Sequence, residues 1–408
     1  MKFFVFHLMP YDGLPDDFGA KYDSAWTDVP NSLYRPEHGH ALYNRFLDEL
    51  VSAEPLGFDG VCVNEHHQSA YGHMPSPNLM ASILARQTER VKIAVIGNAL
   101  PLYNPPTRVA EEMAMIDVIS GGRLIAGLVV GGGPEYYSFS LNPTHARSMY
   151  AEALELVLRA WQDDGPFEHY GEHYKLRHVN PWPRPLQQPH PPIWVPGAGS
   201  TETIQMVAKR RWSYMGIPYF HKSFFKRNFD QFRDACDKEG YEADPEQMGW
   251  LCPIYVSDTD EQAWAEYEKH LFYFIDNLLK GLLVFPPGYT SARSLAKIGG
   301  ALSKFMSHCK TRQDIEEGGY AIVGSPETVR EKMATMIDDL GVGNILGLFQ
   351  LGTLPAHLTR RNMELFAHEV LPHLRKDFNA PMFDVRPRTA DSCYRTESEG
   401  AVAVGSLR

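Results

Sequence analysis

Four polar residues stand directly after a short apolar stretch near position 60. Asn64, Glu65, His66 and His67 follow Val-Cys-Val at 61–63. An imidazole can accept or donate a proton near neutral pH, and a neighbouring carboxylate can orient it or change its pKa. The cluster predicts acid–base chemistry with His66 and Glu65 as catalytic residues, or else a polar strand end hydrogen-bonded into the rim of the fold. No companion Cys or His pair stands at ligand spacing in the sequence, so we expect no metal site.

A second group of small and hydroxylated residues precedes a helical pattern. Gly199, Ser200 and Thr203 lie in the run Pro-Gly-Ala-Gly-Ser-Thr-Glu-Thr at 196–203, and helical periodicity follows from Ile204. Glycines followed by hydroxyls at a helix start present backbone N–H groups and the positive end of the helix dipole, which suits a phosphate. The run lacks the P-loop ending and the dinucleotide fingerprint. Its alternative interpretation is a flexible turn in which Ser200 or Thr201 caps the helix.

Two further positions could approach a ring or a phosphate. Asn98 ends an apolar run, and its amide could donate to a heterocycle carbonyl or accept from a ring N–H, or it could simply close a turn. The glycines at 131–133 would let the backbone come close to a ligand.

These residues need a scaffold that brings them to one place, and the strand pattern supplies one. Short β-branched or apolar runs alternate with helical stretches, which is typical of βαβ units around a parallel sheet. The sequence predicts a (β/α)8 TIM barrel with insertion segments, in which function lies where strands end and βα loops begin. The expected strands are 3–7, 60–64, 92–97, 124–129, 193–196, 213–217, 250–256 and 345–349.

Helix signals fit between these strands. Apolar stripes predict helices near 107–119 and 149–161. A third helix should be capped by Ser325, begin at Pro326 and end at Gly341.

We expect one barrel domain over residues 1–380 and a loose tail over 381–408, which lacks periodicity. Six prolines within 181–192 predict an extended arm. An insertion at about 277–320 is expected to lie over the site as a lid, unless it is a surface excursion or an oligomer contact.

Composition narrows the class of partner. The chain has 408 residues, 44% of them hydrophobic, and a net charge of −11. No Lys/Arg cluster interleaved with aromatics is present, so we expect no nucleic-acid partner. No apolar run approaches the length of a membrane span and the N-terminus shows no signal pattern, so we expect a cytoplasmic protein without a membrane. The five cysteines form no CxxC pair and should be reduced thiols.

The order of the motifs resembles the luciferase-like flavin-dependent monooxygenases. The likeness extends over most of residues 1–215 and runs through Glu65-His66-His67, Pro105-Pro106, Ala110-Glu111-Glu112, the run 117–124, Arg147, Tyr150, Glu152, the run 171–174, the run 191–194 and Gly199-Ser200.

The resemblance implies reduced FMN at the C-terminal face of the barrel, with its phosphate near Gly199, Ser200 and Thr203. Asn98 and Tyr150 would lie near the isoalloxazine or the phosphate, and His66 beside the reactive face of the flavin. In this scheme oxygen adds to the flavin at C4a, and the hydroperoxide passes one oxygen atom to a small organic, apolar substrate.

A separate flavin reductase would supply the reduced FMN, because the chain shows no nicotinamide fingerprint. One alternative is a deazaflavin-dependent dehydrogenase on the same barrel, and another is a non-catalytic flavin-binding partner subunit. A homodimer is expected by analogy, with the helices near 107–119 and 149–161 as interface candidates. Related sequences often carry an Arg where this chain has Val130, so we expect either weaker flavin binding or a compensating Arg from elsewhere, with Arg210 and Arg211 as candidates.

Overall fold

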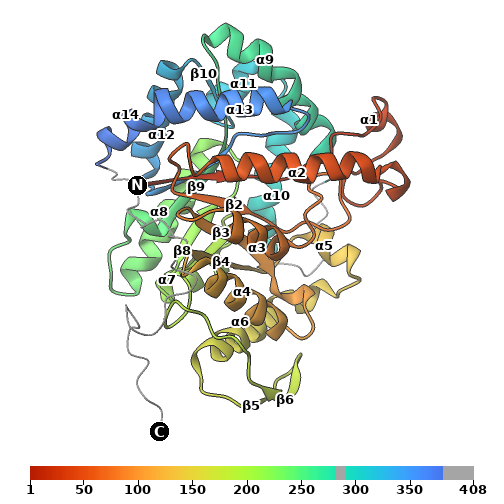
Figure 1. Ribbon diagram of the computed structural model, residues 1–408, viewed down its shortest axis with the longest axis vertical. Coiled ribbons are helices and arrows are strands. Elements are labelled where there is room, and N and C mark those ends of the chain that lie inside the picture. The colour runs from red at the N-terminus through yellow and green to blue at the C-terminus, as the bar shows by residue number, and fades with distance from the viewer. Residues whose placement is uncertain (282–290, 380–408) are drawn as a thin grey trace.

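A closed barrel of parallel strands forms the centre of the molecule (Figure 1). The computed structural model describes residues 1–281 and 291–379, with the backbone alone at 306–308. Eight strands follow one another around the barrel, and the pairing of β8 with β9 closes it. They are β1 (Lys2–Phe6), β2 (Gly60–Val63), β3 (Lys92–Ala99), β4 (Leu124–Val129), β7 (Ile193–Gly197), β8 (Ser213–Gly216), β9 (Met248–Val256) and β11 (Asn344–Leu348). All eight expected strands and the (β/α)8 barrel are therefore confirmed.

Helices cover the outside of the barrel and connect successive strands. They are α2 (Pro36–Ser52), α3 (Pro77–Gln87), α4 (Thr107–Ser120), α6 (Ala146–Gln162), α7 (Thr201–Lys209), α8 (Lys222–Lys238), α9 (Asp260–Tyr273), α12 (Pro326–Leu340), α13 (Ala356–Leu365) and α14 (Leu371–Asp377). Shorter helices are α1 (Phe18–Lys21) and α5 (Gly133–Ser138), with 3-10 turns at Asn31–Leu33, Leu100–Leu102, Pro143–His145 and Pro245–Gln247 and π turns at Phe274–Leu278 and Phe366–Val370.

The three helices predicted from capping and periodicity are present in the structure. Ser325 caps α12 by accepting from the Thr328 amide, Pro326 occupies the first helical position, and Gly341 ends the helix in the left-handed conformation. The expected helix at 149–161 corresponds to α6, and that at 107–119 to α4. Between α6 and β7, the proline-rich arm at 181–192 contains neither helix nor strand.

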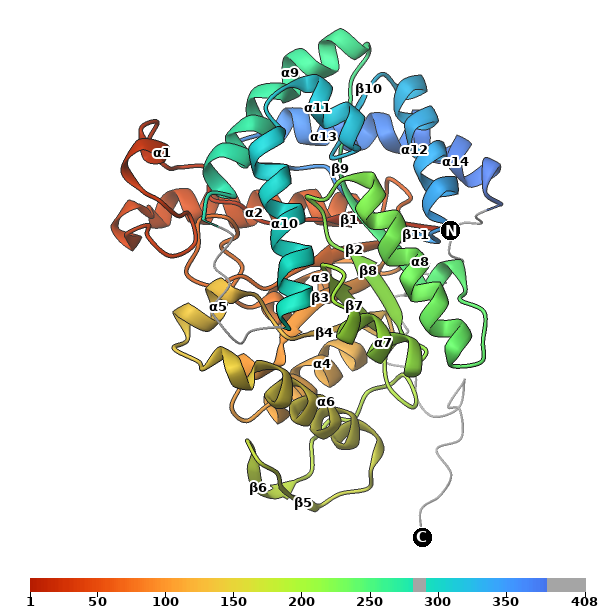
Figure 2. The ribbon, with the colours of Figure 1, turned by 180° about the vertical axis from the view of Figure 1, so that it is seen from behind.

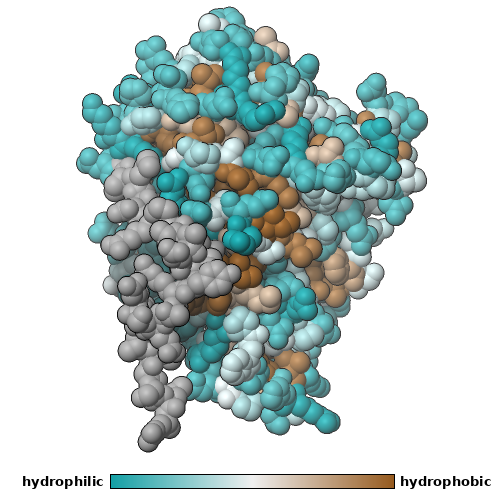
Figure 3. Space-filling model, viewed as in Figure 1, coloured by the Kyte–Doolittle hydropathy of each residue, from teal (hydrophilic) through white to brown (hydrophobic). Residues whose placement is uncertain are grey.

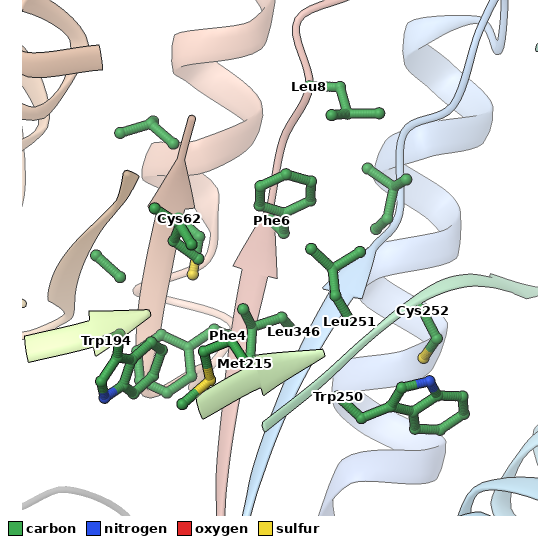
Figure 4. Packing of buried hydrophobic residues seen from close by; sticks show 14 of the residues in the cluster. Phe4, Phe6, Leu8, Cys62, Trp194, Met215, Trp250, Leu251, Cys252 and Leu346 are labelled. Carbon is green, nitrogen blue, oxygen red and sulfur yellow. The ribbon is translucent and has the colours of Figure 1, made fainter. Parts of the chain in front are cut away.

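Large apolar side chains fill the barrel interior, as Figure 4 shows. Phe4, Phe6 and Leu8 follow one another along β1 and the loop after it. The Phe4 ring meets the edge of Trp194 with 4.9 Å between ring centroids. Buried side chains therefore fill the lower layers of the barrel interior, as in other barrels of this type.

Two segments extend beyond the minimal barrel. An antiparallel hairpin, β5 (Phe167–Tyr170) with β6 (Lys175–Val179), projects from the end of α6 (Figure 1). The expected insertion at about 277–320 contains α10 (Ala292–His308) and α11 (Arg312–Gly318), and β10 (Ile322–Gly324) then pairs with β9. The expected tail at 381–408 lies outside the described residues, as does part of the insertion, 282–290. Within the described part of the chain, no helix is long and apolar enough to cross a membrane.

Candidate active site

A cavity of about 290 Å³ lies at the C-terminal ends of the strands. Its floor is the upper layer of the barrel core, formed by Phe6, Leu8, Met215, Leu251 and Leu346. Its rim comes from the loops after β2, β4, β7 and β8, which carry the polar residues of the sequence motifs. A mostly apolar cavity with a few converging polar groups is the usual form of a small-molecule site.

His66 lines this cavity and bonds a carboxylate that the sequence did not single out. Its Nδ1 atom lies 2.9 Å from Oε1 of Glu135, and the side chain of Glu135 is 5% exposed. Burial acts to raise the pKa of Glu135, whereas the hydrogen bond with His66, the charges of His66 and His67 and a backbone hydrogen bond act to lower it, and the pKa is lowered overall. We therefore infer that the carboxylate is ionised and accepts a hydrogen bond from the Nδ1–H group of His66.

Glu65 stands next to His66 in the sequence, but its carboxylate bonds His67. One oxygen, Oε1, lies 2.7 Å from Nε2 of His67. The other, Oε2, accepts from the Asn98 amide, the Ala99 backbone N–H and the Tyr103 hydroxyl at 3.0–3.2 Å. A buried carboxylate with this many donors is a clamp that joins the end of β2 to the end of β3, and it does not orient His66.

Asn98 lies behind the cavity wall. Its flanking residues, Gly97 and Ala99, line the cavity, whereas its own amide nitrogen is committed to Glu65 and Tyr103. A register shift in the pairing of β3 with β4 between Val95 and Asn98 accompanies this placement. The structure thus brings Asn98 to the site as a support for Glu65.

The second motif places several hydrogen-bond donors at another part of the cavity wall and forms a candidate anion site. Ser200 is the N-cap of α7, where its Oγ accepts from the Thr203 amide and lies 2.8 Å from the Thr203 hydroxyl. Arg147 donates from Nη1 to Thr203 Oγ1 at 3.0 Å and from Nη2 to Ser200 Oγ at 3.2 Å. Two hydroxyls, a helix N-terminus and a guanidinium meet here, which is a donor set for phosphate.

Gly199 adopts the left-handed conformation that this turn needs. Its φ is +81°, and a Cβ atom there would collide with the Asn228 amide. Lys297 of α10 donates to the Gly199 carbonyl at 2.9 Å and to Asn228 Oδ1 at 2.7 Å. The insertion helix is thereby bonded to the phosphate-type loop.

The arginine beside the anion site is Arg147, and not Arg210 or Arg211 as expected from the sequence. Arg210 pairs with Glu155, and Arg211 lies over the Tyr241 ring. Neither lines the cavity, while Arg147 does. One helical turn along α6, Tyr150 also lines it, with its hydroxyl donating to the Leu128 carbonyl at 3.0 Å.

Aromatic rings and the insertion complete the walls. Trp26 stacks on Tyr71 at 4.2 Å between centroids, and the hydroxyls of Tyr71 and Tyr219 are 2.8 Å apart. Ile298 and Leu302 of α10 line the same cavity, and Figure 2 shows α10 lying across the barrel strands. The described part of the insertion thus forms a wall of the site.

These residues fit a phosphorylated flavin. Nε of Arg147 is buried without a partner among the described residues, so one donor of the guanidinium is still free for a ligand. Across the cavity, the glycines at 131–133 form the loop after β4, and a Cβ on Gly131 would lie only 3.0 Å from Ala99. The cavity thus joins the candidate anion site to an apolar region, part of whose wall is the backbone of these glycines.

Sequence reasoning missed Glu135, although one signal was present. It follows the 131–133 glycines and Pro134 after a barrel strand, which is where a barrel enzyme carries polar residues. Arg147 belonged to the resemblance but was not given a role.

The fold and the site together define a (β/α)8-barrel enzyme with an anion site and a histidine facing one cavity. Residues 29–343 match the family described as luciferase-like monooxygenase. The chain belongs to this family, whose members are oxidoreductases.

Individual relatives support this assignment. The chain is 36% identical over 333 residues to an uncharacterised protein, y4wF, of Sinorhizobium fredii, covering 78% of this chain and 89% of that one. It is 29% identical over 241 residues to the oxygenase component of a flavin-dependent trigonelline monooxygenase of Acinetobacter baylyi, covering 57% and 64%.

Solved structures share the fold. The oxygenating constituent of 3,6-diketocamphane monooxygenase from Pseudomonas putida, in complex with FMN, matches with a TM-score of 0.65 and 18% identity, covering 91% of this chain and 98% of that one. A coenzyme F420 dependent tetrahydromethanopterin reductase from Methanopyrus kandleri matches with a TM-score of 0.61 and 17% identity, covering 91% and 99%.

Proposed function

We propose that this chain is the oxygenase of a two-component system, which uses reduced FMN and O2 to insert one oxygen atom into a small organic substrate. The observation that carries the proposal is that a phosphate-type site and an unshielded imidazole face one apolar cavity. The family description supports the monooxygenase chemistry, and the relative named as the oxygenase component of a flavin-dependent enzyme supports the flavin.

Each wall of the cavity has a part in this proposal. Ser200, Thr203 and Arg147 hold the phosphate, and Gly199 gives the loop its shape. Tyr150 stands beside Arg147 on α6 and forms the adjoining wall. When bound, reduced FMN supplies the electrons that activate O2. The chain's own part is to bind the flavin and the substrate, to exclude water with the apolar wall of α10, and to move a proton at His66 Nε2.

A separate flavin reductase is part of the proposal because reduced FMN must come from elsewhere. The sequence shows no nicotinamide fingerprint, and a relative is named as the oxygenase component of its enzyme. The expected result is that a flavin reductase plus NADH sustains turnover, whereas NADH alone does not.

We also propose that the chain forms a homodimer through α4. Its outer face exposes Met115, Val118 and Ile119, and Figure 3 shows hydrophobic surface over the region of α3 and α4. By contrast, the exposed residues of α6 are Ser148, Ala151, Glu155 and Gln162, which include no large apolar side chain, so α6 is the weaker of the two expected candidates. Val118→Glu should shift the sedimentation profile from dimer to monomer if this is correct.

The experiment that tests the function begins with binding. FMN, riboflavin and a deazaflavin cofactor are titrated into the purified protein, and the protein with reduced FMN is then given 18O2 and a panel of small apolar compounds. A product that gains one labelled oxygen atom supports the proposal. Preferential deazaflavin binding with substrate-dependent hydride transfer and no oxygen uptake would instead establish the dehydrogenase. Flavin binding without any turnover would favour the non-catalytic subunit.

A further inference from the structure

The buried carboxylate of Glu135 has one clear partner, and that partner is His66. Glu135 belongs to α5, just after the glycines at 131–133, and its Oε1 lies 2.9 Å from His66 Nδ1. Gly132 makes this placement possible, because a Cβ there would lie 2.5 Å from Glu135 Oε2 and would displace the carboxylate. A charge taken out of water in this way is tolerated only when it is paired.

The pairing decides which nitrogen of His66 carries the proton. An ionised carboxylate can only accept, so Nδ1 must donate to it. In the neutral ring Nε2 is then the acceptor. Among the described residues none bonds Nε2, and the imidazole lies at the edges of Trp26 and Tyr71 within the cavity wall.

Asn64 adds a second unpaired group to the same wall. It stands two positions before His66, is 7% exposed, and lines the cavity. Its Oδ1 atom is buried without a hydrogen-bond partner among the described residues. An unpaired buried amide costs free energy, which a ligand with a polar hydrogen would recover.

We propose that Glu135 is the positioning residue that makes His66 a base toward the cavity, and that the substrate is an aromatic compound with a weakly acidic O–H or N–H. In the step, the substrate O–H (or N–H) bond breaks, its electron pair stays on the substrate, and the proton bonds to His66 Nε2. The imidazolium that forms faces the Glu135 carboxylate, which stabilises its charge. This inference rests on the proposed function, which it deepens.

The charges around the cavity favour such a substrate over an anion or a saturated chain. Trp26, Tyr71 and Tyr219 supply flat walls. The cation that lines the cavity, Arg147, is bonded to Ser200 and Thr203 on the far wall. The titratable ring that contacts His66 is that of Tyr71, whose pKa burial raises. Glu65 also lines the cavity, but its carboxylate is held by His67 and other donors and has no bond to His66 among the described residues. A neutral O–H or N–H group of the substrate, which loses its proton only to His66, therefore suits this part of the cavity better than a substrate carboxylate does.

The tautomer of His66 is tested in the protein without flavin. We expect 15N NMR at neutral pH to show a protonated Nδ1 and an unprotonated Nε2 in the wild type. Glu135→Leu should shift the ring to a mixture of tautomers, and Glu135→Gln is the fallback of similar size if the Leu variant does not fold. Glu152→Gln is the matched control, since Glu152 pairs with His169 at 2.9 Å outside the cavity and should leave the His66 signals unchanged. A wild-type ring protonated on Nε2 alone would overturn the positioning role.

The substrate class is tested with 4-nitrophenol as the probe, because its ionised form absorbs visible light. We expect the bound probe to show a ratio of phenolate to phenol about tenfold above that of the free probe at the same pH, which corresponds to one pKa unit. Glu135→Gln and His66→Ala should return the ratio toward the free value, and Glu152→Gln should not. Failure of the probe to bind, or a ratio unaffected by Glu135→Gln, would overturn the inference. FMN titration of the same variants separates this failure from failure of the proposed function, because the phosphate wall is untouched.

Discussion

The guanidinium of Arg147 donates to Ser200 Oγ at 3.2 Å, although the two residues are 53 positions apart in the sequence. Arg147 comes from α6 and Ser200 from the loop after β7, so the donor set depends on the packing of α6 beside the mouth of the barrel.

Replacing Arg147 should weaken the binding of FMN much more than that of riboflavin. A hydrogen bond from a charged donor contributes about 1.5–3 kcal/mol, so Arg147→Ala should raise the Kd of FMN roughly ten- to a hundredfold. Riboflavin lacks the phosphate, and its Kd should change little. Fluorescence titration of both ligands measures the difference.

Arg210→Ala is the control for that experiment, because Arg210 pairs with Glu155 outside the cavity. Its FMN affinity should match the wild type. An equal loss of FMN affinity in the two variants would contradict the assignment of the phosphate wall to Arg147.

Ser200→Ala should lower both stability and FMN affinity. Losing a helix N-cap costs about 1 kcal/mol of unfolding free energy, and the same hydroxyl is part of the phosphate site. Ser325→Ala is a matched control, since Ser325 caps α12 with the same Ser–Thr geometry far from Arg147. Urea unfolding should show similar losses in both variants, and FMN titration should separate them. Unchanged FMN affinity in Ser200→Ala would remove Ser200 from the site.

Glu65→Gln should lower the stability of the protein, whereas His66→Ala should lower its turnover. Both oxygens of Glu65 accept hydrogen bonds from buried donors. A Gln side chain has one acceptor oxygen and one donor NH2 group, so Glu65→Gln should reduce the unfolding free energy by about 1–3 kcal/mol. His66→Ala should fold normally but lose about a hundredfold in turnover on a substrate identified by the screen. Denaturant unfolding and kcat are the two measurements. A stable Glu65→Gln variant with lost turnover would show that Glu65, and not Glu135, works with His66.

His73 should make the protein less stable in mild acid. Burial lowers its pKa from 6.5 to about 4, and neither ring nitrogen has a hydrogen-bond partner in the described structure. Between these values the unfolded chain binds a proton that the folded chain does not, so stability falls as the pH drops from 6.5 toward 4. At pH 5 this amounts to about 2 kcal/mol for this group.

His73→Phe keeps the aromatic packing against Tyr43 and should remove about one proton from the pH dependence of the unfolding free energy between pH 7 and 5. His40→Gln, at an exposed histidine, should leave that dependence unchanged. Equal slopes for wild type and His73→Phe would show that His73 titrates normally.

The barrel was predictable because each strand is encoded locally. Runs such as 60–63 and 124–129 are buried on both faces and are therefore continuously apolar. The hairpin β5–β6 escaped prediction because β5 alternates between half-buried and exposed residues and β6 has a single buried residue, Val179, so neither strand is an apolar run. The helices α10 and α11 were missed inside an insertion rich in glycine and proline, where α10 itself contains Gly299 and Gly300.

The sequence by itself determined the scaffold, the phosphate-type turn at Ser200 and the presence of His66 at a strand end, because propensity, capping and strand order are written over a few consecutive residues. Only the tertiary structure decided the partners: Glu135 for His66, His67 for Glu65, and Arg147 for Ser200. Neighbours in an extended segment point to opposite sides, so the carboxylate adjacent to His66 turns away from it. The carboxylate that reaches His66 comes from α5, which follows β4, and folding of the barrel brings it within hydrogen-bonding distance.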